Sequence, residues 1–147
     1  MRGAAIARAA GACLLAMLAP WAGADAQTRD GVYAGTIQCD ALPALRPLKT
    51  KVAMTVAEGR ARYEREILTP TGAPSGAFER GEGPVGPSGD VTLTTRAAAP
   101  GYSYEAEYRG QIGDGSARLT GTQRWKIQRE SGTIVRACAL ELLRTPQ

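Results

Sequence analysis

The sequence has no histidine among its 147 residues. Histidine is the general base of the Ser-His-Asp and Cys-His triads, the side chain that titrates nearest neutral pH and the commonest metal ligand. Its absence removes the most frequent routes to hydrolytic and zinc chemistry. We therefore expect a non-enzymatic protein that needs no cofactor and no metal.

Carboxylate pairs are the acid–base option that remains. Glu64 with Glu66, and Glu105 with Glu107, have alternate spacing, which places both members of each pair on one face of an extended strand. That face carries the charged residues of its strand, so it is expected to lie in water. We interpret these pairs as solvated surface charge.

Long apolar runs are also scarce, and the one at the start is typical of an export signal. Arg2 and Arg8 give a positive start, residues 9–18 an apolar core, and residues 24–26 (Ala-Asp-Ala) a small-x-small cleavage motif. The apolar run is too short to span a bilayer. A lipoprotein anchored through Cys13 is the alternative.

We thus expect residues 1–26 to be a cleaved signal peptide and residues 27–147 to form a single domain, with no integral membrane segment after cleavage. The destination is the periplasm or the extracellular medium. Sixteen Lys and Arg would remain against thirteen Asp and Glu, with both signs interleaved. Nucleic-acid binding favours a clustered basic patch, so we expect no nucleic-acid partner, and we expect a monomer.

Cysteine is rare, and only Cys39 and Cys138 remain after cleavage. Two cysteines in an exported chain allow one disulfide. Such a bridge would close a loop of about a hundred residues, for which chain entropy gives at most about 4–5 kcal/mol. Two buried free thiols are the alternative.

The mature chain has no long apolar stretch of helical period. Instead, period-2 alternation bounded by Gly, Pro, Asp and Ser recurs about every 12 residues, which is an all-β pattern. The pattern predicts eight strands, at residues 31–39, 49–57, 60–68, 77–85, 91–96, 102–110, 117–127 and 133–144.

Eight strands joined by short turns, with a disulfide from the first to the last, most simply form a single antiparallel up-and-down barrel. A two-sheet β-sandwich is the alternative. Four glycines favour the barrel, because strongly coiled strands bend at glycine. These are Gly35, Gly81, Gly110 and Gly121.

Some polar residues fall on the apolar phase of their strands. Arg65 and Gln123 do so, and Arg136 shares the phase of Cys138. A buried guanidinium or amide without partners costs several kcal/mol, so each needs a partner. The internal account pairs Arg65 with Glu79 or Glu82 of the next strand, and Gln123 with a tyrosine hydroxyl.

The functional account is a pocket at the barrel mouth that takes a small acidic or aromatic ligand. Its expected lining is Arg65, Arg80, Gln123, Tyr63, Tyr104 and Trp125.

Three short motifs carry a resemblance: residues 30–35 (Asp-Gly-Val-Tyr-Ala-Gly) in the first strand, Gln123-x-Trp125 near the end, and the two terminal-strand cysteines. With these the chain resembles small bacterial exported β-barrel proteins of uncharacterised function. It is similar in plan to the avidin and lipocalin group, whose first strand opens with a glycine and an aromatic two residues later, as Gly31 and Tyr33 do here. No ligand-site residues of that group match.

The resemblance implies a small exported barrel but no ligand. Our leading hypothesis is that this barrel binds something in the periplasm or outside the cell. The alternatives are a protein–protein partner such as an envelope hydrolase (lysozyme-type) inhibitor, acting through loops 40–48 and 69–76, or a structural envelope protein. A deep polar cavity would favour a small ligand. A filled barrel with a projecting loop would favour a protein partner.

Overall fold

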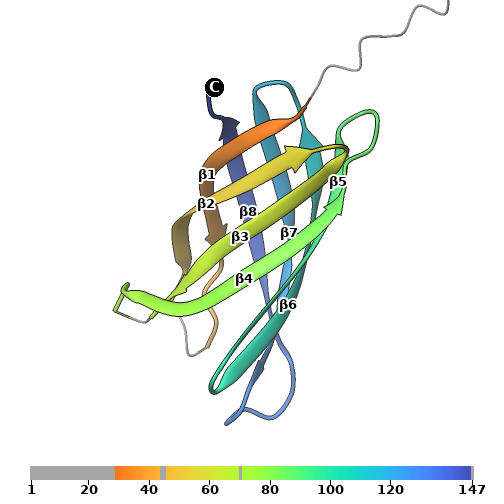
Figure 1. Ribbon diagram of the computed structural model, residues 1–147. Coiled ribbons are helices and arrows are strands. Elements are labelled where there is room, and N and C mark those ends of the chain that lie inside the picture. The colour runs from red at the N-terminus through yellow and green to blue at the C-terminus, as the bar shows by residue number, and fades with distance from the viewer. Residues whose placement is uncertain (1–28, 44–45, 70, 147) are drawn as a thin grey trace, which may run out of the picture.

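The computed structural model describes residues 29–43, 46–69 and 71–146, so the expected signal peptide lies outside the described residues. The described chain is one closed antiparallel barrel in sequence order, as predicted, and the sandwich does not form (Figure 1). Its strands are β1 (Gly31–Cys39), β2 (Leu48–Ala57), β3 (Arg60–Leu68), β4 (Pro74–Pro84), β5 (Asp90–Ala99), β6 (Tyr102–Ile112), β7 (Ser116–Ile127) and β8 (Ile134–Arg144). Within these residues there is no helix that could cross a membrane.

Two strands extend three residues beyond a predicted end. β4 begins at Pro74 instead of Ala77, and β5 runs on through three alanines to Ala99 instead of ending at Arg96. Alanine is a weak strand former, but here cross-strand pairing decides. Ala99 pairs with Tyr102 at the end of the β5–β6 hairpin, so the alanines complete that hairpin.

The predicted disulfide is present. Cys39 of β1 and Cys138 of β8 are register partners and are joined by an S–S bond across 99 residues of sequence. Both side chains point inward and are 5% exposed. The bridge therefore fastens the first strand to the last from inside the barrel.

At the upper end of the barrel, where β1 begins and β8 ends (Figure 1), Arg29 and Tyr33 bond to neighbouring turns. Arg29 donates from Nε to the carbonyl of Ile112 at 2.9 Å and from Nη1 to that of Pro87 at 3.0 Å. The Tyr33 hydroxyl lies 2.9 Å from the carbonyl oxygen of Arg29 and 3.1 Å from that of Gly113. These bonds join β1 to the β4–β5 and β6–β7 turns.

Below these bonds the interior is layered. Apolar side chains fill the upper half, and a smaller cluster at the lower end comprises Leu42, Ile67, Ala97, Tyr104 and Trp125. The buried polar or charged residues are Arg65, Glu79, Thr95, Gln123 and Arg136. All five belong to the strand segments that lead toward the lower end.

Glycine sets the curvature at the four predicted positions. A Cβ added at Gly35, Gly81, Gly110 or Gly121 would lie 1.8 to 2.1 Å from a carbonyl oxygen of the neighbouring strand. No other residue fits such an approach without a backbone shift. Gly81 lets β4 approach β5 closely, within the three register pairs that these two strands share.

Main-chain pairing is incomplete in the lower half. β2 pairs with β3 only over 53–57 and 60–64, so their lower ends separate. β4 and β5 share three register pairs, from Arg80↔Arg96 to Glu82↔Thr94, and an isolated bridge above them. Figure 1 shows the β3–β4 hairpin diverging from the β5–β6 hairpin below this point. We call this boundary the β4/β5 seam.

Candidate binding site

The candidate site is a set of interior side chains at the level of the seam, which we call the buried polar cluster. Alternation along each strand turns these side chains inward. Its members are Tyr63 and Arg65 of β3, Glu79 of β4, Thr95 of β5, Tyr104 and Tyr108 of β6, Gln123 and Trp125 of β7, and Arg136 of β8.

Glu79 is the acceptor at the centre of the cluster and is fully buried. Its Oε2 accepts from Arg65 Nε at 3.0 Å, from Arg65 Nη2 at 2.8 Å and from the Tyr63 hydroxyl at 3.3 Å. Its Oε1 accepts from Thr95 Oγ1 at 2.6 Å and from the Tyr108 hydroxyl at 2.9 Å. Side chains of four strands therefore meet at one carboxylate just below the last main-chain pair of the seam.

Gln123 links the second half of the cluster. Its Nε2 donates to the Tyr108 hydroxyl at 2.9 Å, and its Oε1 accepts from Trp125 Nε1 at 3.1 Å and from Arg136 Nε at 2.7 Å. Tyr108 joins the halves, since it bonds both Gln123 and Glu79. The internal account of the sequence is thereby confirmed: Glu79 pairs with Arg65, and a tyrosine hydroxyl meets Gln123.

Burial sets the protonation behaviour of the cluster. Burial, and then the negative charge of Glu79, raise the pKa of Tyr63, Tyr104 and Tyr108 above the ordinary tyrosine range. Burial alone lowers the pKa of Arg65, but interactions with Tyr104 and Glu79 outweigh it and leave that pKa raised. The tyrosines therefore stay neutral donors well above neutral pH.

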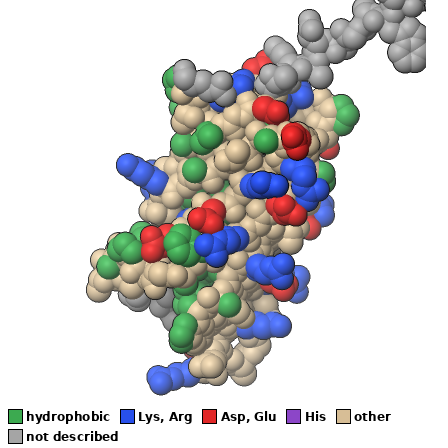
Figure 2. All heavy atoms as spheres, in the orientation of Figure 1, with side chains coloured by type: hydrophobic (Ala, Val, Ile, Leu, Met, Phe, Trp, Pro, Cys, Tyr) green, Lys and Arg blue, Asp and Glu red, His purple; other side chains and the backbone are tan. Residues whose placement is uncertain are grey.

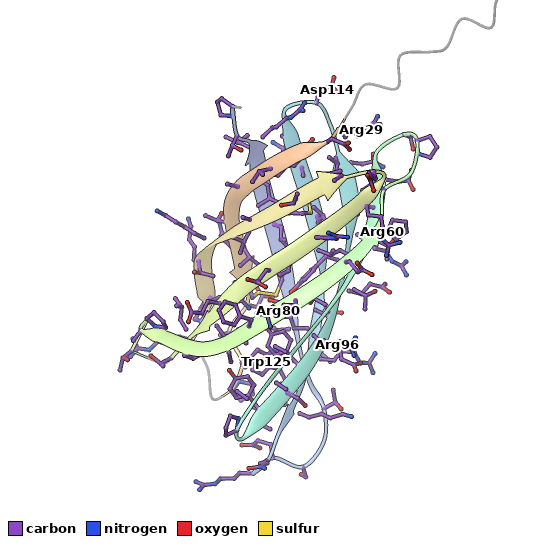
Figure 3. The ribbon with its side chains drawn as sticks, viewed as in Figure 1. Arg29, Arg60, Arg80, Arg96, Asp114 and Trp125 are labelled. Carbon is purple, nitrogen blue, oxygen red and sulfur yellow. A yellow bond between two sulfur atoms is a disulfide. The ribbon has the colours of Figure 1, made fainter. Side chains whose placement is uncertain are left out.

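Aromatic rings form the floor of the cluster at the lower end. Tyr104 stacks on Trp125 with ring centroids 4.3 Å apart, and Tyr102 lies 5.4 Å from the same ring. The Arg136 guanidinium lies 4.9 Å from the Trp125 centroid. Trp125 is thus packed by side chains from both strands that flank β7, and Figure 3 places it toward the lower end, away from Arg29 and Asp114.

The structure brings together five of the six predicted site residues: Tyr63, Arg65, Tyr104, Gln123 and Trp125. All five are buried, and their polar groups bond within the cluster.

Arg80 does not join them. It follows the inward-facing Glu79 and so lies on the outer face of β4, where its side chain is 63% exposed (Figure 3). There its Nε donates to Glu64 at 2.6 Å, and its guanidinium lies 4.7 Å from the Phe78 ring centroid.

Arg80 instead lines an outer groove of about 980 Å³ that crosses β2 to β6. Charges of both signs lie along one register row of this face, Glu64↔Arg80↔Arg96↔Glu105, with two paired arginines between two glutamates. Figure 2 shows this mixture of acidic and basic side chains on the visible surface. Because no single sign dominates, the groove has no evident charge preference for a ligand.

Sequence reasoning left four cluster members out of the predicted site: Glu79, Thr95, Tyr108 and Arg136. The sequence pointed to Arg136 as an inward residue, since it shares the phase of the inward-facing Cys138. It pointed to Glu79 only as a possible partner of Arg65. Thr95 and Tyr108 had no such signal, because threonine and tyrosine are common residues in strands.

The fold and this site define a class: a closed, disulfide-bridged eight-stranded barrel with a charged cluster in its interior. No protein-family model matches the chain, and neither the curated proteins nor the solved structures contain a significant match.

Proposed function

We propose that this protein is an exported, non-enzymatic binding barrel of the periplasm or extracellular medium, and that it binds its ligand at the lower end. The observation that carries the proposal is the difference between the two ends. At the upper end, hydrogen bonds from Arg29 and Tyr33 join the start of β1 to the neighbouring turns, whereas the strand pairs β2–β3 and β4–β5 separate at the lower end.

The side chains at the lower end support binding there. Tyr102 and Ile134 are only partly buried and pack on the inner apolar cluster around Trp125. Small-molecule sites are typically concave and lined by apolar and aromatic side chains with a few fixed polar groups, and here the adjacent buried polar cluster supplies the polar groups. Export is supported by the signal-like residues 1–26 and by the disulfide.

Native mass spectrometry of protein recovered from the periplasm of an expression host tests the proposal. We expect the wild type to retain a small molecule, Tyr102→Ala to lose most of it, and Asp114→Ala at the upper end to retain it. Equal loss in both variants, or no retained molecule in the wild type, would contradict lower-end binding of a small ligand.

A protein partner is the second candidate. Two features favour it: side chains fill the barrel interior, and the β3–β4 hairpin projects (Figure 1). Loops 40–48 and 69–76 are the two that the sequence indicates for a hydrolase inhibitor, and their described residues lie at the lower end. A photo-crosslinker at Ser75 should then capture a defined protein that a crosslinker at Asp114 does not. Identical capture at both positions would contradict this candidate.

A further inference from the structure

The buried polar cluster contains one more cation than anion. Arg65 is 5% exposed, Arg136 is 6% exposed, and Glu79, fully buried, is the one carboxylate that bonds within the cluster. Glu79 neutralises Arg65 through a contact of 2.8 Å. Within the described residues, no carboxylate lies within ion-pair distance of Arg136.

Glu79 has no capacity left for Arg136. Both of its oxygens already accept from Arg65, Thr95 and two tyrosines. Arg136 Nε instead donates a hydrogen bond to the uncharged side-chain oxygen of Gln123, 2.7 Å away. In the part of the chain that the structure describes, neither Nη nitrogen of Arg136 has a hydrogen-bond partner. No fully buried side-chain nitrogen there lacks a partner, so both Nη groups lie where solvent or a ligand can reach them.

An uncompensated buried guanidinium is unfavourable, and arginine does not escape by losing its proton in proteins. Burial lowers the pKa of Arg136, and the charge of Arg65 lowers it further. Tyr104, Tyr108 and Glu79 act in the opposite direction and raise the pKa of Arg136, but the burial effect is larger and the pKa stays lowered. The two tyrosines are neutral near pH 7. The site therefore favours one added negative charge.

We propose that Arg136 anchors a binding site for a small monocarboxylate at the lower end of the barrel. The guanidinium fork matches a carboxylate with two parallel N–H···O bonds, and both Nη groups have hydrogens to donate. Gln123 holds Nε and Trp125 supports the guanidinium plane, so the fork is oriented before a ligand arrives. This inference rests on the proposed function, because it supplies the ligand class for the lower-end site.

Isothermal titration calorimetry with sodium acetate, butyrate and benzoate, at constant ionic strength, tests the inference, with sodium chloride and inorganic phosphate as comparisons. We expect saturable binding of at least one carboxylate to the wild type. Arg136→Met should weaken it at least tenfold, and Arg136→Lys should weaken it less, because lysine keeps the charge but loses the fork. Arg96→Gln, an exposed arginine of the outer face, is the matched control and should bind as the wild type does.

Thermal unfolding without carboxylates gives a second readout that does not depend on the choice of ligand. Because Arg136→Met removes an uncompensated buried charge and keeps an apolar side chain of similar length, it should unfold at a temperature equal to or above that of the wild type. A Tm several degrees lower would overturn the inference, since it would mean that the charge of Arg136 is already stabilised within the chain.

The two proposals fail differently. Carboxylate binding that is unchanged in Arg136→Met, tighter binding of phosphate than of any carboxylate, or no carboxylate binding at all would overturn the role of Arg136. Each of these results would leave lower-end binding of another ligand standing. Loss of the retained molecule in the upper-end variant Asp114→Ala would overturn lower-end binding, whatever the titrations give.

Discussion

Replacement of Glu79 by glutamine should be the most damaging conservative change in the barrel. Glutamine keeps the shape and one acceptor oxygen, which can still serve Thr95 and Tyr108. The amide nitrogen then takes the place of Oε2, where it faces three donor hydrogens, two from Arg65 and one from Tyr63. Arg65 would be left buried without its counter-charge.

The expected loss follows from that geometry. Removing one partner of a buried ion pair costs about 3–5 kcal/mol, because the other charge stays buried and uncompensated. Total stability of a domain this size is on the order of 5–15 kcal/mol. Glu79→Gln should thus remove a large part of the stability of the barrel, and it should lower Tm by roughly 10–20 °C.

Urea unfolding followed by tryptophan fluorescence measures the change, with Tm from calorimetry as a check. Glu82→Gln is the matched control on the same strand, since Glu82 pairs with Arg60 at the surface and should cost no more than about 0.5 kcal/mol. The double variant Arg65→Met, Glu79→Leu removes both charges and should recover much of the loss. A loss below about 1 kcal/mol in Glu79→Gln, with an unchanged slope in urea, would refute the central role of this carboxylate.

Three further outcomes follow from the fold. Reduction of the disulfide, or Cys39→Ser with Cys138→Ser, should cost up to about 4–5 kcal/mol, measured by urea unfolding with and without reductant, and no change would contradict a bridge that closes 99 residues of sequence. Gly81→Ala should lower Tm, because its Cβ would lie 2.1 Å from a β5 carbonyl oxygen, whereas Gly115→Ala has open space and should not; equal Tm values would contradict the close approach. The tyrosines of the buried polar cluster have raised pKa values in the folded state, so the stability that they contribute is complete below pH 10, where unfolded tyrosine titrates, and falls as the pH rises further. With three such groups the fall should approach about 4 kcal/mol per pH unit, and ultraviolet titration should show them ionising together with unfolding instead of near pH 10.

Much of the barrel could be predicted because its determinants are local or few. Period-2 alternation predicted eight strands close to their observed bounds. Only two cysteines lie outside the expected signal peptide, so one bridge was possible, and it placed the first strand beside the last. The phase of each clearly alternating strand also identified Arg65, Gln123 and Arg136 as inward residues. Their partners could be narrowed to adjacent strands, which is how Glu79 entered as a candidate for Arg65.

The rest could not be predicted, and β4 shows why. Around Arg80 the strand reads Phe-Glu-Arg-Gly-Glu-Gly, with a charged residue on each phase and glycine where an apolar residue would mark the inner face. The sequence of such a strand does not show which residues face inward. Pairing with β3 and β5 decides that the Arg80 side chain faces outward. The separation of β4 from β5 depends on the same long-range pairing and leaves no local signal.

The position of the buried polar cluster relates stability to binding in this barrel. Main-chain pairing between β4 and β5 stops at Arg80↔Arg96, and the side-chain bonds of the next residue, Glu79, then reach β5 and β6. Side-chain hydrogen bonds thus replace main-chain pairing between β4 and β5 where that pairing ends. The acceptor of these bonds is the Glu79 carboxylate, so a charged group lies inside the barrel. Glu79 balances the charge of Arg65 from within the chain, whereas the charge of Arg136 has no such balance among the described residues. A carboxylate bound there would balance the charge of Arg136 as Glu79 balances the charge of Arg65. Ligand binding should therefore stabilise the lower end of the barrel most.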